Sequence, residues 1–132
     1  MTGRPDRAAP DLLDAARAGY GGLLLGAPRR MIGVCTTVPA GSRAVGVARV
    51  LGARHLLQAA LTAGVLSVRM PPDEIPPSTM LLAGSAVDTA HAISMIGLAL
   101  ARRPLRRAAL ADAVLEAGFA AFGILIARHV RC

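Results

Sequence analysis

The chain has 132 residues, the usual length of one domain. Apolar residues make up 54% of it and charged residues 17%, where ordinary globular chains have about 45–50% and about 25%. This bias favours a lipid environment, although an aromatic content of 2% supplies few of the interfacial anchors that membrane proteins use. The net charge is +7, and all of the basic residues are arginine.

The basic charge admits two interpretations. Arginine can bind nucleic-acid phosphates, or it can face anionic lipid from the cytoplasmic ends of membrane helices. The arginines of this chain gather where helices are expected to end, and no aromatic residues lie between them on which bases could stack. We therefore predict membrane lipid as a partner and do not expect nucleic acid. Cys35 and Cys132 are too few for a disulfide framework, and the first residues lack the pattern of an export signal.

The first 42 residues combine one short helix with irregular segments. Residues 1–10 are expected to form a loose polar tail. A helix is predicted over residues 11–26, with Asp11 capping its first turn and a glycine stopping it. The stop signal leaves about 14 residues in the helix, which gives a helix length of about 21 Å. The hydrocarbon core of a membrane is about 30 Å thick, so a helix of this length is too short to cross it. We expect this helix to lie in the interface or beside the bundle, and residues 27–42 to form a Pro- and Gly-containing connector.

Three longer helices follow, and no segment alternates in the manner of a strand. Their expected ranges are 43–68, 79–101 and 105–127, separated by the proline-rich residues 69–78 and the arginine-rich residues 102–107. We predict an all-α fold: an antiparallel helical bundle of three long helices, within residues 43–128, plus one shorter N-terminal helix, embedded in a membrane. Residues 1–132 are expected to form a single helical domain.

Each of the three long helices can cross a bilayer with some tilt, although none contains a charge-free run of 18 residues. Placing the start of the first long helix in the cytoplasm puts most arginines inside, in agreement with the positive-inside tendency. The arginines then expected inside are Arg4, Arg7, Arg29, Arg30, Arg43, Arg102, Arg103, Arg106 and Arg107, and those outside are Arg69, Arg128 and Arg131. The pattern predicts a polytopic protein of the cell membrane with three spans.

Each long helix carries polar or ionisable residues near its midpoint, and in an antiparallel bundle these midpoints lie at similar depth. The expected layer consists of Arg54, His55, Gln58, Asp88, His91 and Glu116. An isolated charge at the bilayer centre costs about 2.5–3.5 kcal/mol on insertion scales. We therefore expect these residues to face one another, with Arg54 paired to Asp88 or Glu116. Such a layer can fix the helix register, or it can bind a proton or a small solute.

Metal binding and catalysis find little support in the sequence. Asp88 and His91 are three residues apart, and His55 and Glu116 could complete a metal site. Di-iron bundles, however, repeat a Glu-x-x-His pair, and the neighbouring Arg54 would repel a cation. No phosphate-binding loop or nucleophile–base arrangement is present. We predict no metal, no cofactor and no enzymatic activity.

The segments RVLGARHLLQA (49–59) and VDTAHAISM (87–95), followed by an arginine-rich turn, resemble small polytopic membrane proteins of high-GC actinobacteria. The resemblance covers about the last two-thirds of the chain and leaves out residues 11–26 and 27–42. It implies a membrane topology and no particular activity.

Three functions stay open at this point. The first is a structural or accessory membrane protein, as a subunit of a larger membrane complex. The second is a minimal proton-coupled or small-solute transporter that works as a homo-oligomer. The third is a soluble helical bundle that binds a hydrophobic ligand or partner. The strip Ala109, Ala113, Ala117 and Ala121, with one small residue every four positions, favours close helix packing of the kind that builds homo-oligomers.

Overall fold

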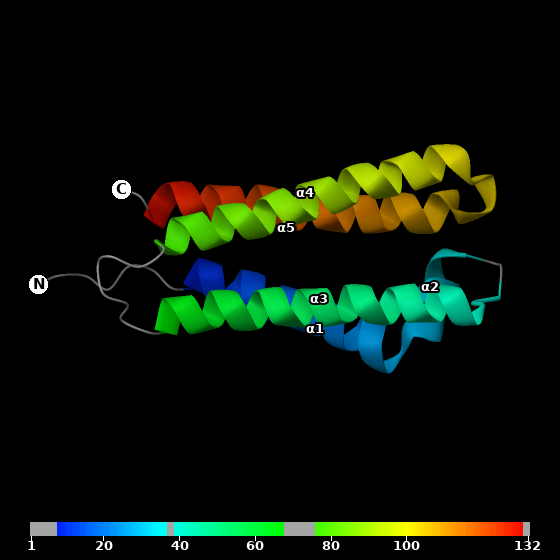
Figure 1. Ribbon diagram of the computed structural model, residues 1–132, viewed down its shortest axis with the longest axis horizontal. Coiled ribbons are helices and arrows are strands. Elements are labelled where there is room, and N and C mark those ends of the chain that lie inside the picture. The colour runs from blue at the N-terminus through cyan, green and yellow to red at the C-terminus, as the bar shows by residue number, and fades with distance from the viewer. Residues whose placement is uncertain (1–7, 37–38, 68–75, 131–132) are drawn as a thin grey trace, which may run out of the picture.

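The computed structural model describes residues 8–36, 39–67 and 76–130, and every regular element in these ranges is helical (Figure 1). The elements are α1 (Ala8–Gly26), α2 (Pro28–Cys35), α3 (Ser42–Ser67), α4 (Pro77–Ala101), the short 3₁₀ helix η1 (Arg103–Leu105) and α5 (Arg106–Val130). The all-α class is therefore confirmed. The three long predicted helices correspond to α3, α4 and α5, with ends that differ by up to three residues.

The N-terminal part differs from the prediction in two ways. First, residues 8–10 of the expected tail belong to α1, because Pro10 lies in the first turn, where its missing N–H has no intrahelical partner to lose. At 19 residues, α1 is about 28 Å long, which is longer than predicted, but it is not one of the described helices that are long and apolar enough to cross a membrane. Second, the predicted connector 27–42 contains α2, because Pro28 ends α1 and at the same time starts a new helix. The rest of the tail lies outside the described residues.

The four long helices form two antiparallel hairpins that face each other (Figure 1). One hairpin pairs α1 with α3 and the other pairs α4 with α5, and contacts within each hairpin are far more extensive than contacts between them. The backbones of α1 and α3 touch at two glycines. A Cβ atom on Gly52 would lie only 2.6 Å from the carbonyl oxygen of Gly21, so both positions require glycine.

Small residues hold α4 and α5 together. The buried ones on the facing sides are Ala92, Ala99, Ala109, Ala113 and Ala120. Of the predicted alanine strip, Ala109 and Ala113 are thus used within the chain, whereas Ala117 and Ala121 are exposed. The strip divides because buried positions on a helix follow a spacing of three and four residues, and a strict spacing of four drifts away from the interface.

The distribution of polarity is inverted relative to a protein that folds in water. The apolar core cluster is small and consists of Leu13, Leu81, Ile126 and Ala127, while large aliphatic side chains cover the outside of the long helices. Exposed examples are Leu57, Leu61, Val87, Ile93, Ile96, Leu110, Val114 and Leu125. Among the described residues, exposed charges lie near helix ends or in the connections between helices. A continuous apolar surface of this kind indicates contact with lipid or with another apolar surface.

Two exposed hydroxyl groups lie on the same aliphatic surface of the long helices, which we call the apolar belt, and both donate hydrogen bonds within their own helix. Thr89 donates a hydrogen bond to the Ser85 carbonyl oxygen at 2.8 Å, and Ser94 donates one to the Ala90 carbonyl oxygen at 2.9 Å. Each hydroxyl is satisfied by its own helix, four residues back.

Two of the described helical segments are long and apolar enough to cross a membrane, Pro77–Ala101 and Arg103–Val130. α3, the third span expected from the sequence, has similar length. Its hydropathy is lowered by Arg54, His55 and Gln58, which lie in the middle of the helix.

Candidate functional site: a polar layer between the hairpins

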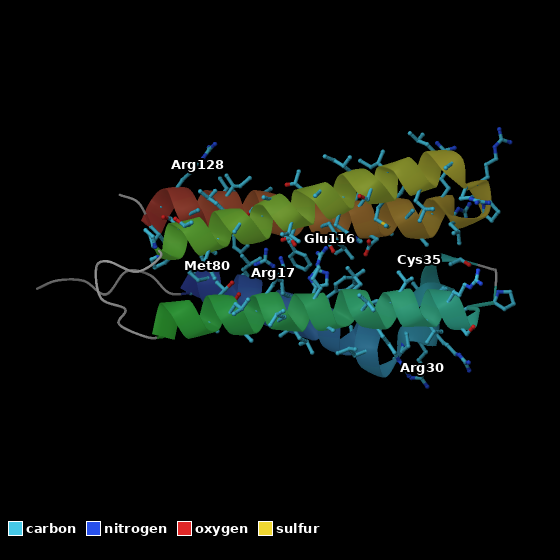
Figure 2. The ribbon with its side chains drawn as sticks, in the orientation of Figure 1. Arg17, Arg30, Cys35, Met80, Glu116 and Arg128 are labelled. Atoms are coloured by element: carbon cyan, nitrogen blue, oxygen red, sulfur yellow. The ribbon has the colours of Figure 1, made fainter. Side chains whose placement is uncertain are left out.

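The two hairpins meet through a layer of polar side chains halfway along the bundle. The α1–α3 hairpin supplies the positive charges, Arg17 and Arg54, and the α4–α5 hairpin supplies the carboxylates, Asp88, Asp112 and Glu116. Figure 2 shows Arg17 and Glu116 pointing into the space between the two hairpins. Within the layer, the facing sides of the two hairpins therefore carry opposite and complementary charges.

Asp88 on α4 is the most heavily bonded carboxylate of the layer. It is fully buried and forms an ion pair with Arg17 of α1, which is 1% exposed. Arg17 contacts Oδ2 of this carboxylate, whereas the Arg54 guanidinium lies 3.1 Å from Oδ1. The Gln58 amide also donates a hydrogen bond to Oδ1, at 3.0 Å. Asp88 thus accepts bonds from both helices of the opposite hairpin.

Glu116 on α5 is the second fully buried carboxylate. Its Oε2 accepts a hydrogen bond from Arg54 at 2.6 Å, and its Oε1 lies 2.9 Å from His55 Nε2. Arg54 therefore bridges α4 and α5 from α3, so that a single guanidinium contacts both buried carboxylates.

Asp112 lies one turn along α5 from Glu116 and is less deeply buried. Tyr20 of α1 donates a hydrogen bond to its Oδ1 at 2.6 Å, and His91 Nε2 of α4 lies 2.9 Å from its Oδ2. The Tyr20 ring packs edge-on against His55 at 5.2 Å between ring centroids, and Phe119 packs against His55 in the same manner at 5.5 Å. Two of the three aromatic residues of the chain, Tyr20 and Phe119, thus pack within this layer.

The structure brings all six residues of the predicted layer to the same region. Arg54, Gln58, Asp88 and Glu116 form one connected network with His55, and His91 joins it through its position beside Asp112. Three members lie outside the six predicted residues: Arg17, Tyr20 and Asp112. The signal for the first two was present, because Leu13, Arg17, Tyr20 and Leu24 lie three or four residues apart and so share one face of α1.

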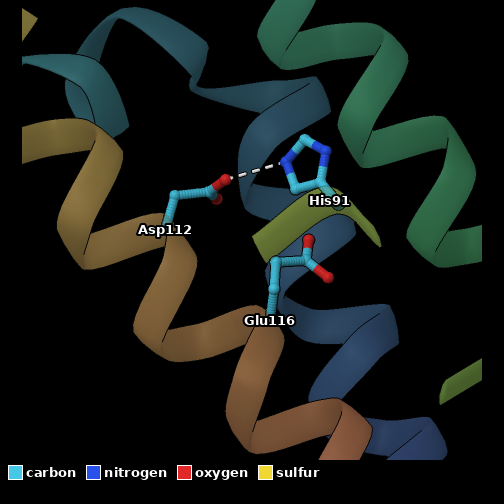
Figure 3. Close-up of side chains that lie close together, drawn as sticks. All are labelled: His91, Asp112 and Glu116. Atoms are coloured by element: carbon cyan, nitrogen blue, oxygen red, sulfur yellow. Dashed lines mark hydrogen bonds and ion pairs between the residues drawn. The ribbon is translucent and has the colours of Figure 1, made fainter. Parts of the chain in front are cut away.

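Three residues of the layer have the spacing of metal ligands. One ligand atom each from His91, Asp112 and Glu116 lies within 4.8 Å of the other two (Figure 3). This set differs from the one considered from the sequence, since Asp112 takes the place of Asp88 and His55 is not part of it. Oε2 of Glu116 accepts a hydrogen bond from Arg54 of α3, whereas Oε1 lies 2.9 Å from His55 Nε2 without forming a hydrogen bond. The Arg54 guanidinium beside Glu116 would repel a cation at this cluster.

No family of known proteins, no curated protein and no solved structure matches this chain. The resemblance to small actinobacterial membrane proteins therefore stays a prediction.

Proposed function

We propose that this chain is a small polytopic integral membrane protein with a structural or accessory role. The observation that carries the proposal is the inverted polarity: ion pairs fill the middle of the bundle and aliphatic side chains cover its outside. In water such a surface would drive aggregation, whereas in hydrocarbon it is the favourable arrangement. Because α1 contributes Arg17 and Tyr20 to the layer, it lies at the same depth as the other helices. The proposal therefore has four helices crossing the membrane rather than three.

The arginines supply an orientation for this proposal. Eight described and exposed arginines lie at the end of the bundle formed by α2, the start of α3 and η1, whereas Arg128 lies at the other end. By the positive-inside tendency, the α2–η1 end faces the cytoplasm. Arg4, Arg7, Arg69 and Arg131 of the predicted distribution lie outside the described residues.

Fractionation of the expressed protein tests the membrane assignment. The chain should remain with the membrane pellet through a carbonate wash and enter the supernatant only when detergent is added. Release by carbonate alone, or appearance in the soluble fraction, would overturn the proposal in favour of a soluble helical bundle that binds an apolar ligand or partner.

The geometry of the layer supports the structural role. Asp88, Asp112 and Glu116 each contact groups from the opposite hairpin, so the layer determines how the hairpins fit together. A hollow at the surface of the bundle is lined by residues of α1, α2, α3 and the α1–α2 connection. None of these residues belongs to the layer, so this hollow does not open onto the polar side chains of the layer. Polar contacts that set helix register and partner choice are a common use of such residues in membranes.

A proton carrier is the second candidate, and one observation favours it. Asp112, His91, Glu116 and His55 form a series of neighbouring titratable groups that runs from a partly exposed pair to a fully buried one. Neither ring nitrogen of the buried His55 has a hydrogen-bond partner among the described residues, and its Nε2 lies 2.9 Å from Glu116 Oε1. Series of acidic and histidine side chains act as proton relays in pumps and transporters.

A flux measurement separates the two candidates. The purified protein is reconstituted into vesicles carrying a pH-sensitive dye, and the decay of an imposed pH gradient is followed. A structural protein should leave the decay at the rate of protein-free vesicles. Faster decay that is abolished by Glu116→Gln, and kept by the control Asp11→Asn at an exposed end of α1, would replace the structural role by the carrier.

A further inference from the structure

The cytoplasmic end of the bundle contains a basic hollow that the structural role does not use. It has a volume of about 810 Å³ and lies where α1 ends, α2 begins and α3 begins. Three arginines line it, Arg29 and Arg30 from α2 and Arg49 from α3, and Figure 2 places Arg30 at this end of the molecule. The described lining contains no acidic residue, and no described carboxylate forms an ion pair with any of the three arginines.

The backbone adds to the positive potential of the hollow. α2 starts at Pro28 and α3 starts at Ser42, both of which line the hollow, and neither helix has an acidic residue in its first turn. Ala27, the residue before α2, provides no side-chain cap. Helix N-termini carry unpaired N–H groups and partial positive charge, so arginines placed there are electrostatically unfavourable unless an anion is present.

The rest of the lining is apolar or small. Ala27, Pro28, Val45 and Gly46 contribute no polar side chain, and the neighbouring surface of α3 exposes Val47 and Val50. A ligand that fits this lining has an anionic group for the arginines and an apolar part that continues along the helix surface.

We propose that this hollow binds the phosphate of an anionic phospholipid headgroup from the cytoplasmic leaflet. Basic pockets on the cytoplasmic side of membrane helices bind such headgroups. The lipid, rather than a soluble phosphate compound, is the ligand because the hollow borders the apolar belt. The choice of a lipid over a soluble phosphate compound rests on the proposed membrane location.

The test compares lipid retention by variants of the full chain. Each protein is reconstituted in phosphatidylcholine membranes with a minor fraction of phosphatidylglycerol, extracted in mild detergent, and its retained lipids are counted by native mass spectrometry. Arg29→Gln with Arg49→Gln should lower the preference for phosphatidylglycerol about 25-fold, or about fivefold for each arginine removed. Gly46→Leu should lower it with every arginine in place, because a side chain at Gly46 meets no atom within 4 Å and extends into open space.

The control is Arg102→Gln with Arg103→Gln, which removes two exposed arginines at the same end of the bundle but outside the hollow. This variant should keep the preference. An equal loss in the control would show diffuse attraction and overturn the site. Displacement of the lipid by 10 mM inorganic phosphate would assign the hollow to a soluble phosphate compound and overturn the lipid assignment. Protein that incorporates into the membranes without lipid preference contradicts only this inference, whereas protein that fails to incorporate contradicts the membrane proposal.

Discussion

The buried charge of Asp88 explains why several polar side chains gather in the layer. Its carboxylate lies in the middle of a helix whose outer face is aliphatic, so its charge needs partners from within the bundle. Arg17 and Arg54 supply two guanidinium groups, and Gln58 supplies an amide. Arg17 is equally dependent on Asp88, because it is almost fully buried and Asp88 is its ion-pair partner. Each residue of the pair therefore depends on the other for its burial.

Removing the Asp88 charge should therefore destabilise the bundle. The substitution Asp88→Asn keeps the size of the side chain but leaves the Arg17 guanidinium buried without its ion-pair partner, which should cost about 3 kcal/mol in the free energy of unfolding. Unfolding of the purified protein in mixed detergent micelles measures the change. Asp11→Asn, at an exposed acid in the first turn of α1, is the control and should cost less than about 1 kcal/mol. An Asp88→Asn protein as stable as the parent would contradict the pairing.

At the scale of elements, the two hairpins are held together internally by different means. α1 and α3 approach through Gly21 and Gly52, whose backbones are in contact, whereas α4 and α5 pack through alanines. In both hairpins, small residues shorten the distance between the two helices. Small residues have the same effect between membrane helices, where the hydrophobic effect provides little driving force for association and close packing is needed instead. Close packing within each hairpin leaves the longer polar side chains to fill the space between the hairpins.

The glycine contact gives a prediction with an internal control. Gly52→Ala places a methyl group 2.6 Å from the Gly21 carbonyl oxygen and 3.0 Å from Leu24 Cβ, so α1 and α3 must separate, at a cost of about 1–3 kcal/mol. Gly64→Ala is on the same helix, where an added methyl meets nothing within 4 Å. It should be neutral or stabilising by up to about 1 kcal/mol, because alanine favours the helix. Thermal unfolding of both variants in detergent compares them, and equal effects would contradict the contact.

The sequence predicts the elements better than it predicts their partners. Hydropathy and proline positions were sufficient for α3, α4 and α5, because long apolar helices leave a periodic and weakly charged pattern. α2 was missed because Pro28 and the glycines of that region are equally compatible with an irregular connector. The midpoints of the long helices predicted the depth of the layer. Which cation faces which carboxylate depends on helix rotation and pairing, and the contribution of α1 depends on its packing against α3.

At the scale of the whole molecule, charge is sorted in two directions. Along the bundle, exposed arginines gather at the α2–η1 end; across it, positive groups of one hairpin face negative groups of the other. The first pattern suits a membrane surface with anionic lipid, and the second suits an interior from which water is excluded. Composition alone indicated an apolar chain with scattered charge. The inversion of polarity becomes visible only when the helices are placed together.

The most direct test of this inversion is the accessibility of the apolar belt in native membranes. Val114, in the middle of α5, is 71% exposed, whereas Arg103 is exposed in the connection before that helix. In a chain with Cys35→Ser and Cys132→Ser, Val114→Cys and Arg103→Cys are treated separately with a membrane-impermeant maleimide in opened membrane vesicles. Arg103→Cys should label within minutes, and Val114→Cys should stay unlabelled until the protein is denatured in SDS. Labelling of both at the same rate would show that the apolar belt faces water, and would contradict the membrane-embedded bundle.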